Sequence, residues 1–196
     1  HARLLAKLEA IGIKGRLLAW IKEWLTGRKQ RVVINGMASD WKDVLSGIPQ
    51  GSILGPLLFI IFINYLDLGI KNSILKFADD TKLFGGVGTL EDIEKLRMDL
   101  LELYRWSEKW QMKFNIDKCK VMHIGTNNKE ANYEMAGRNL DTVIEERDLG
   151  VIISKNFKVS GQCVKAANKG NQILGLINRT ITCKNKRVIL NLYKSL

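Results

Sequence analysis

The chain has 196 residues and a mass of 22.2 kDa, which is enough for one sizeable core or two small domains. A hydrophobic content of 46%, a charged content of 26% and only two prolines exclude disordered, collagen-like and low-complexity classes. The longest apolar run, residues 57–63, is far shorter than the about 20 residues that a membrane-spanning helix needs. Three cysteines without a CxxC pair argue against a disulfide scaffold, so we expect an intracellular protein of the cytoplasm or nucleus that is not secreted.

The net charge of +11 is distributed unevenly along the chain. Residues 1–31 carry +6, residues 149–196 carry nine basic and no acidic residues, and residues 32–148 carry −4. We call residues 1–31 and 149–196 the basic flanks. Two basic flanks around an acidic centre are typical of a protein that binds phosphate backbones at its edges and cations in its middle. A solvated basic surface is the alternative interpretation.

Hydrophobic periodicity and turn signals predict helices and short strands without a strict βαβ repeat, which favours an α+β fold with an antiparallel sheet. The dipeptide Asn35-Gly36 is a strong hairpin signal, and Thr89 followed by Asp92 predicts a capping box. In chain order, the expected elements are two helices within 3–25, a hairpin with strands at 30–35 and 41–45, a helix over 57–66, strands at 74–78 and 82–84, a helix from the capping box to about 113, strands at 120–124, 133–135 and 149–153, and a helical region from about 160 onward.

Two adjacent carboxylates, Asp79 and Asp80, lie at the tip of the hairpin predicted between residues 74 and 84. Like charges this close repel one another unless a cation compensates them. Magnesium is such a cation, because it prefers carboxylate oxygens together with substrate phosphates. A solvated Asp-Asp turn is the alternative.

A second candidate site is the segment SGIPQGS at 46–52, which we call the glycine loop and which contains Gly47, Pro49, Gln50 and Gly51. Glycines on both sides of a rigid proline, just before a helix, let backbone N–H groups approach an anion or a base. The segment is not a Walker loop, because no GK[ST] sequence follows. An ordinary connecting loop is the alternative.

In combination, the glycine loop, GPLLF at 55–59 and FADD at 77–80 resemble the palm of reverse transcriptases, most closely the non-LTR (LINE-type) retrotransposon enzymes. NIDKCKVM at 115–122 resembles their lysine-bearing motif, and Leu149-Gly150-Val151 is similar to the primer-grip hairpin. The resemblance covers the whole chain. It implies a palm-like antiparallel sheet packed on helices, with partial fingers and palm over 1–153 and the start of a truncated helical thumb over 154–196.

The resemblance also implies roles for individual residues in RNA-templated DNA synthesis from deoxynucleoside triphosphates, with an RNA template and an RNA–DNA hybrid as partners. Asp79 and Asp80 would hold the two Mg²⁺ ions, and Lys118 would lie near the pyrophosphate as a general acid, unless it is simply a solvated lysine. The residues that would shape the nucleotide and template pocket are Gly47, Pro49, Gln50 and Gly51.

One departure from the family pattern bears on activity. Family members carry a further metal-binding Asp upstream of the first helices, and no residue in 1–45 matches it. The sequence begins without Met and stops within an apolar helix-like stretch, so we expect a fragment with an incomplete two-metal site that is inactive alone. Two alternatives stay open: a non-catalytic palm remnant that only binds nucleic acid, and an inert translated transposon remnant.

Overall fold

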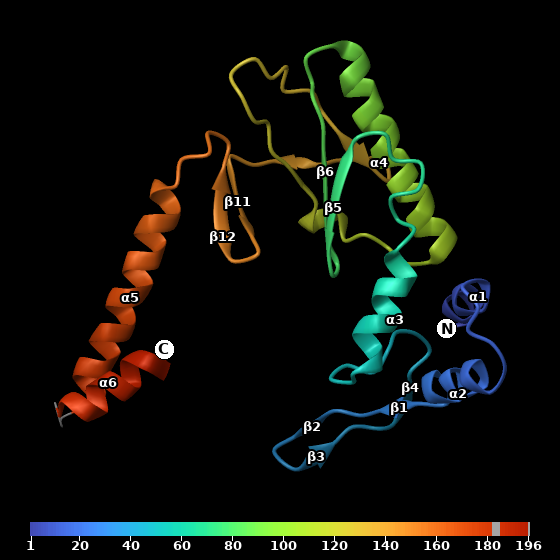
Figure 1. Ribbon diagram of the computed structural model, residues 1–196, viewed down its shortest axis with the longest axis horizontal. Helices are drawn as coiled ribbons and strands as arrows, with labels where there is room; N and C mark the ends of the chain where they lie inside the picture. Colours follow the sequence, from blue (N-terminus) through green and yellow to red (C-terminus); the bar gives the residue numbers. More distant parts are fainter. Residues whose placement is uncertain (182–184, 196) are drawn as a thin grey trace. The chain divides into compact units, whose positions relative to one another are not determined.

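The computed structural model describes residues 1–181 and 185–195. The chain forms two compact units: unit 1 comprises His1–Ile116 and Ala131–Asn139, and unit 2 comprises Asp117–Glu130 and Leu140–Leu196 (Figure 1). The elements of unit 1 are α1 (Ala2–Ala10), α2 (Gly15–Leu25), β1 (Lys29–Gln30), β2 (Val33–Ile34), β3 (Met37–Ala38), β4 (Lys42–Asp43), α3 (Leu54–Ile63), β5 (Ser73–Phe77), β6 (Asp80–Phe84), α4 (Leu90–Trp110), β8 (Glu134–Met135) and β9 (Arg138–Asn139). A short 3₁₀ helix, Ile116–Lys118, follows α4, and the elements of unit 2 are β7 (Lys120–Val121), β10 (Asp141–Thr142), β11 (Glu145–Asp148), β12 (Val151–Ser154), α5 (Ser160–Thr180) and α6 (Lys186–Ser195).

The core of unit 1 forms where α1, α2 and α3 pack together. Leu8, Leu25 and Leu58, one from each helix, are almost completely buried. Leu4 and Leu8 of α1 lie four residues apart, so both point to the same side of the helix and into this core. The periodic helical pattern of residues 3–25 therefore correctly predicted both helices.

The helix α4 begins at the predicted capping box. The Thr89 hydroxyl accepts a hydrogen bond from the Asp92 backbone N–H at 3.1 Å, and the Asp92 carboxylate accepts one from the Thr89 N–H at 3.0 Å. Each bond satisfies a backbone donor that the first turn of a helix otherwise leaves unpaired. The helix ends three residues earlier than predicted, because Gln111 adopts a left-handed conformation with φ of 54°.

The strands pair two by two rather than in one larger sheet. Among the described residues there are six two-stranded pairs, of which five are antiparallel and one, β7 with β10, is parallel. The α+β class is therefore confirmed, whereas the palm-like sheet and the domain boundary at residue 153 stay predictions. The strands β8 and β9 pair across a turn at residues 136–137.

Unit 2 is built from short strands and exposed helices. Leu149-Gly150 forms the turn between β11 and β12, as expected for a hairpin at this place. The side chain of Gln162 in α5 accepts a hydrogen bond from the Ile152 N–H of β12 at 2.9 Å. The helix α5 itself buries no residue. No helix in the described part of either unit is both long and apolar enough to cross a membrane.

Candidate active site

The two adjacent carboxylates lie at the turn of the β5–β6 hairpin, which we call the Asp hairpin. Its register runs from Ser73 opposite Phe84 to Phe77 opposite Asp80, so that only Ala78 and Asp79 form the turn. Asp80 is therefore the first residue of β6 and not part of the turn itself. A two-residue turn is the commonest connection in a β-hairpin, and it fixes the register of both strands.

The turn of the Asp hairpin stores backbone strain. Ala78 has a φ of 52°, in the left-handed region, whereas Asp79 does not. A positive φ at the first central residue alone is the pattern of a type II′ turn, which usually has glycine there. An alanine in this conformation costs about 1–2 kcal/mol. Strain of this kind clusters at functional sites, where the surrounding structure holds it in place.

Both carboxylates of the Asp hairpin are exposed, and neither forms a hydrogen bond or an ion pair with another side chain in the described part of the chain. The neighbouring Lys76 does not neutralise them, because its ammonium group contacts Asp67 Oδ1 at 2.8 Å and the Asn64 carbonyl at 3.0 Å. The hydrogen bond from Lys76 lowers the pKa of the Asp67 carboxyl below its usual value. Asp79 and Asp80 are thus open to a cation from solvent.

Within the described residues, Asp79 and Asp80 have no third His, Cys, Asp or Glu side chain beside them. Across residues 1–181 and 185–195, no three His, Cys, Asp or Glu side chains form a group that could hold a metal ion. The donor set that the chain presents is therefore two carboxylates, which suit a hard cation such as Mg²⁺ but leave most of its coordination sphere to other ligands.

The first half of the glycine loop is held by side chains from distant parts of unit 1. The Gly47 carbonyl accepts hydrogen bonds from Arg28 Nη2 at 2.7 Å and from the His1 ring Nε2 at 2.8 Å. Gly47 and Gly51 have φ of 77° and 76°, a conformation in which other residues are strained. The two glycines are thus required by the path of the loop.

The second half of the glycine loop joins the start of α3. The Ser52 hydroxyl donates to the Pro49 carbonyl at 2.7 Å and accepts from the Gly55 N–H at 3.0 Å. A Cβ atom at Gly55 would lie 2.8 Å from Ser52 Oγ and 2.9 Å from the Pro49 oxygen, so no side chain fits there. The loop therefore has a defined backbone, and Gln50 is exposed on it.

The predicted site residues are divided between the two units. The glycine loop and the Asp hairpin both belong to unit 1, but no hydrogen bond or ion pair joins Gly47, Pro49, Gln50 or Gly51 to either carboxylate within the described residues. Lys118 is exposed at the end of the 3₁₀ helix and belongs to unit 2. Its role near the carboxylates stays a prediction.

Sequence reasoning missed Lys7, a lysine that is only 5% exposed. Its ammonium group donates to the Phe62 carbonyl and lies 3.9 Å from the ring centre of Trp110 and 4.6 Å from that of Phe62. Burial, and secondarily the charge of Lys109, lower the pKa of Lys7 from 10.5 to about 8. The sequence feature that could have indicated the burial of Lys7 was its position on the apolar stripe of α1, between Leu4 and Leu8.

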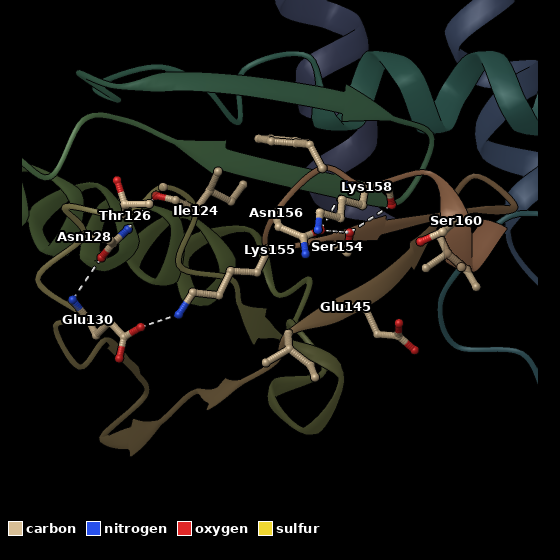
Figure 2. A pocket seen from close by; sticks show the side chains of 15 residues that line it. Ile124, Thr126, Asn128, Glu130, Glu145, Ser154, Lys155, Asn156, Lys158 and Ser160 are labelled. Atoms are coloured by element: carbon tan, nitrogen blue, oxygen red, sulfur yellow. Dashed lines mark hydrogen bonds and ion pairs between the residues drawn. The ribbon is translucent and has the colours of Figure 1, made fainter. Parts of the chain in front are cut away.

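Unit 2 contains a groove with a volume of about 860 Å³ (Figure 2). Its lining includes two lysines, Lys155 and Lys158, and two glutamates, Glu130 and Glu145, so the formal charges cancel. Lys155 forms an ion pair with Glu130, and this hydrogen bond lowers the pKa of the Glu130 carboxyl. The groove thus lacks the excess positive charge that a phosphate site needs.

Comparison with known proteins identifies the family of the chain. The profile of the family described as "Reverse transcriptase (RNA-dependent DNA polymerase)" matches residues 1–176. The chain belongs to the reverse transcriptase family.

The relatives of the chain indicate which group of reverse transcriptases it resembles. The chain is 24% identical over 206 residues to the "RNA-directed DNA polymerase from mobile element jockey" of Drosophila funebris. The aligned region covers 99% of this chain and 22% of the relative. The chain is 27% identical over 191 residues to the "Probable RNA-directed DNA polymerase from transposon BS" of Drosophila melanogaster. This aligned region covers 86% of the chain and 21% of the relative. The resemblance to non-LTR retrotransposon polymerases is thereby confirmed, and the chain spans about a fifth of the length of these curated relatives.

Proposed function

We propose that this chain is the palm region of a non-LTR retrotransposon polymerase that copies RNA into DNA, and that Asp79 and Asp80 are its metal-binding carboxylates. The observation that carries the proposal is the Asp hairpin: a strained two-residue turn presents two exposed carboxylates without a cationic partner among the described side chains. Such an arrangement is costly for the protein alone and becomes favourable when a divalent cation binds.

The donor set fits Mg²⁺, because both groups are carboxylates and both are open to solvent. When bound, a pair of such ions would activate the primer 3′-hydroxyl and neutralise the triphosphate. The contribution of the chain is to hold Asp79 and Asp80 next to each other at the end of a rigid hairpin. Any further ligand would come from outside the described residues, because no third carboxylate joins the pair there.

The glycine loop would shape the pocket for the incoming nucleotide and the template. Its support is the fixed backbone: Gly47 is held by Arg28 and His1, and Pro49 by Ser52, so the loop can present Gln50 without collapsing. Lys118 would supply a proton to the leaving pyrophosphate. Its exposed ammonium group has the three N–H donors that this role requires.

The basic flanks would bind the RNA–DNA hybrid. Nine basic and no acidic residues follow Asp148, and α5 exposes Lys165, Lys169 and Arg179. Neutralising about four phosphates would give a slope of about −3 to −4 in a plot of log affinity against log salt concentration. Binding at low salt that weakens with this slope supports the proposal, and binding without salt dependence contradicts it.

A primer-extension assay on an RNA template tests catalysis. We expect no synthesis by the 196-residue chain, because two carboxylates hold too little negative charge to fix two Mg²⁺ ions beside a primer end. We expect synthesis once the chain is extended with the flanking segments of the Drosophila funebris relative. Robust synthesis by the chain alone would refute the expected inactivity.

The alternative function, a palm remnant that binds nucleic acid without catalysis, predicts a different pair of results. It shares the salt-dependent binding of the hybrid, since the basic flanks are the same. It predicts that the extended chain also makes no DNA. Primer extension by the extended chain therefore separates the two functions, and the binding assay tests what they share.

A further inference from the structure

A buried carboxylate on α4 has no part in the site described so far. Asp99 is only 1% exposed, and it accepts hydrogen bonds from the Lys71 N–H at 2.9 Å, from the Asn72 N–H at 2.8 Å and from the Asn72 side-chain amide at 2.8 Å. A buried carboxylate is strongly disfavoured unless donors of this kind surround it. Asp99 therefore ties α4 firmly to residues 71 and 72.

Those two residues stand directly before β5, and a glycine stands directly after β6. A Cβ atom added to Gly85 would overlap Asn72 Oδ1 and lie 2.8 Å from Asn72 Cγ. The Asn72 side chain thus fills the space between Asp99 and the backbone of Gly85. Asp99, Asn72 and Gly85 form a clamp on the open end of the Asp hairpin, opposite its turn.

We infer that this clamp positions the catalytic hairpin, so that Asp99 and Asn72 are positioning residues for Asp79 and Asp80; the inference rests on the proposed function. Five paired positions connect the clamped end, Ser73 opposite Phe84, with the end that carries Asp80 opposite Phe77. Because side chains alternate across a strand, a slip of one residue would move Asp80 to the other face. Fixing the open end against α4 selects one register and one face.

Two glycine substitutions test the clamp with a matched control. Gly85→Ala pushes the Asn72 amide away from Asp99, whereas a Cβ atom at Gly86 meets nothing within 4 Å, and neither glycine has a positive φ. Both substitutions reduce the freedom of the unfolded chain equally. Asp99→Asn is a second variant, because an amide cannot accept all three hydrogen bonds.

The first measurement is amide hydrogen exchange by NMR on the full 196-residue chain without metal. We expect Gly85→Ala and Asp99→Asn to raise exchange about tenfold at Leu75, Phe77 and Asp80, whose N–H groups belong to hydrogen-bonded pairs of the hairpin, and to leave the amides of α1 unchanged. Gly86→Ala should match the unsubstituted chain. Equal exchange in Gly85→Ala and Gly86→Ala would overturn the clamp.

The second measurement uses Mn²⁺ as a paramagnetic probe of the carboxylates. We expect Mn²⁺ to broaden the signals of the Asp hairpin in the unsubstituted chain, to do so about tenfold more weakly in Gly85→Ala, and not at all in Asp80→Asn. Unchanged Mn²⁺ affinity in a Gly85→Ala chain with raised exchange would reduce the clamp to a stabilising contact and overturn the inference. An unsubstituted chain without any broadening would instead contradict the metal-binding proposal, while hydrogen exchange still decides whether the clamp holds the open end of the hairpin.

Discussion

Unit 1 and unit 2 differ in what they bury. Every buried hydrophobic side chain of the described residues belongs to unit 1, including Leu8, Leu25 and Leu58 of the helical core. Unit 2 buries a single described residue, His123. Its contacts are strand pairs, exposed ion pairs such as Lys120 with Asp141 at 2.7 Å, and the hydrogen bond of Gln162.

The difference in burial bears on the two tasks of the proposed function, which are metal binding and binding of a phosphate backbone. In the function proposed above, metal-dependent chemistry would need carboxylates held to within a fraction of an ångström, and the Asp hairpin belongs to the unit that has a buried core. Binding of a phosphate backbone would need charge more than rigid geometry, and unit 2 contributes the basic flank after Asp148, which includes exposed basic residues of α5. A protein can leave the second task to a region with little core.

The difference in burial between unit 1 and unit 2 is tested most strongly by truncating a buried leucine and an exposed leucine to alanine. Leu8→Ala removes a fully buried side chain of α1, so we expect the free energy of unfolding to fall by about 2–5 kcal/mol. Leu174→Ala removes a side chain of α5 that is 57% exposed, and we expect a change within about 0.5 kcal/mol. Urea denaturation followed by circular dichroism measures both. Equal losses would show that unit 2 has a core of its own.

The local elements of unit 1 could be predicted from sequence, because their signals lie within a few residues. Thr89 and Asp92 predicted the start of α4, and the strands expected at 74–78 and 82–84 predicted the Asp hairpin. The sequence placed both carboxylates in the turn, whereas the pairing of Phe77 with Asp80 leaves only Asp79 there.

The tertiary contacts could not be predicted in this way, because the partners lie far apart in the chain. Asp99 binds a backbone N–H that is 28 residues away, and Lys7 binds a carbonyl that is 55 residues away. Both residues occupy a helix position where periodicity calls for an apolar side chain, which is the one local sign of a buried polar contact. The pairing of strands two by two likewise depends on contacts that no short segment encodes.

The pH dependence of stability gives a second, smaller effect in unit 1. The pKa of Lys7 is about 8 in the folded protein and 10.5 in the unfolded chain, so the unfolded chain binds more protons between these values. The free energy of unfolding should therefore rise between pH 8 and 10, by about 1–2 kcal/mol because solvent screens part of the shift.

Lys7→Met isolates this effect. The difference in unfolding free energy between the original chain and Lys7→Met, measured at several pH values, should change with pH in this window, whereas the other titrating groups cancel in the difference. A constant difference from pH 7 to 10 would contradict a buried Lys7.

The capping box of α4 should affect the free energy of unfolding somewhat less than the titration of Lys7 does. Thr89→Ala removes the hydroxyl that accepts the Asp92 N–H, and we expect a loss of about 0.5–2 kcal/mol in the free energy of unfolding. Thr126→Ala, an exposed threonine of unit 2, is the control and should leave stability nearly unchanged. If the two variants were equally stable in thermal unfolding, α4 would not depend on its cap.

The smallest effect is expected for the ion pairs of unit 2. Lys155→Ala breaks the pair with Glu130, and because both side chains are largely exposed we expect a loss of about 0.2–1 kcal/mol. Salt screens such pairs, so the difference between the two chains should shrink as salt is raised. A loss comparable to that of Leu8→Ala would mean that unit 2 depends on this pair as unit 1 depends on its core.

The most direct test of the account is the effect of removing one carboxylate from the Asp hairpin in the chain extended with the flanking segments of the Drosophila funebris relative. Asp79→Asn and Asp80→Asn each keep the size of the side chain but remove a charge that would hold the metal ion. We predict that either variant loses several orders of magnitude in the rate of primer extension on an RNA template, while Asp40→Asn, an exposed aspartate beside β4, keeps full activity. Normal synthesis by Asp79→Asn and Asp80→Asn would contradict the assignment of this hairpin as the catalytic centre.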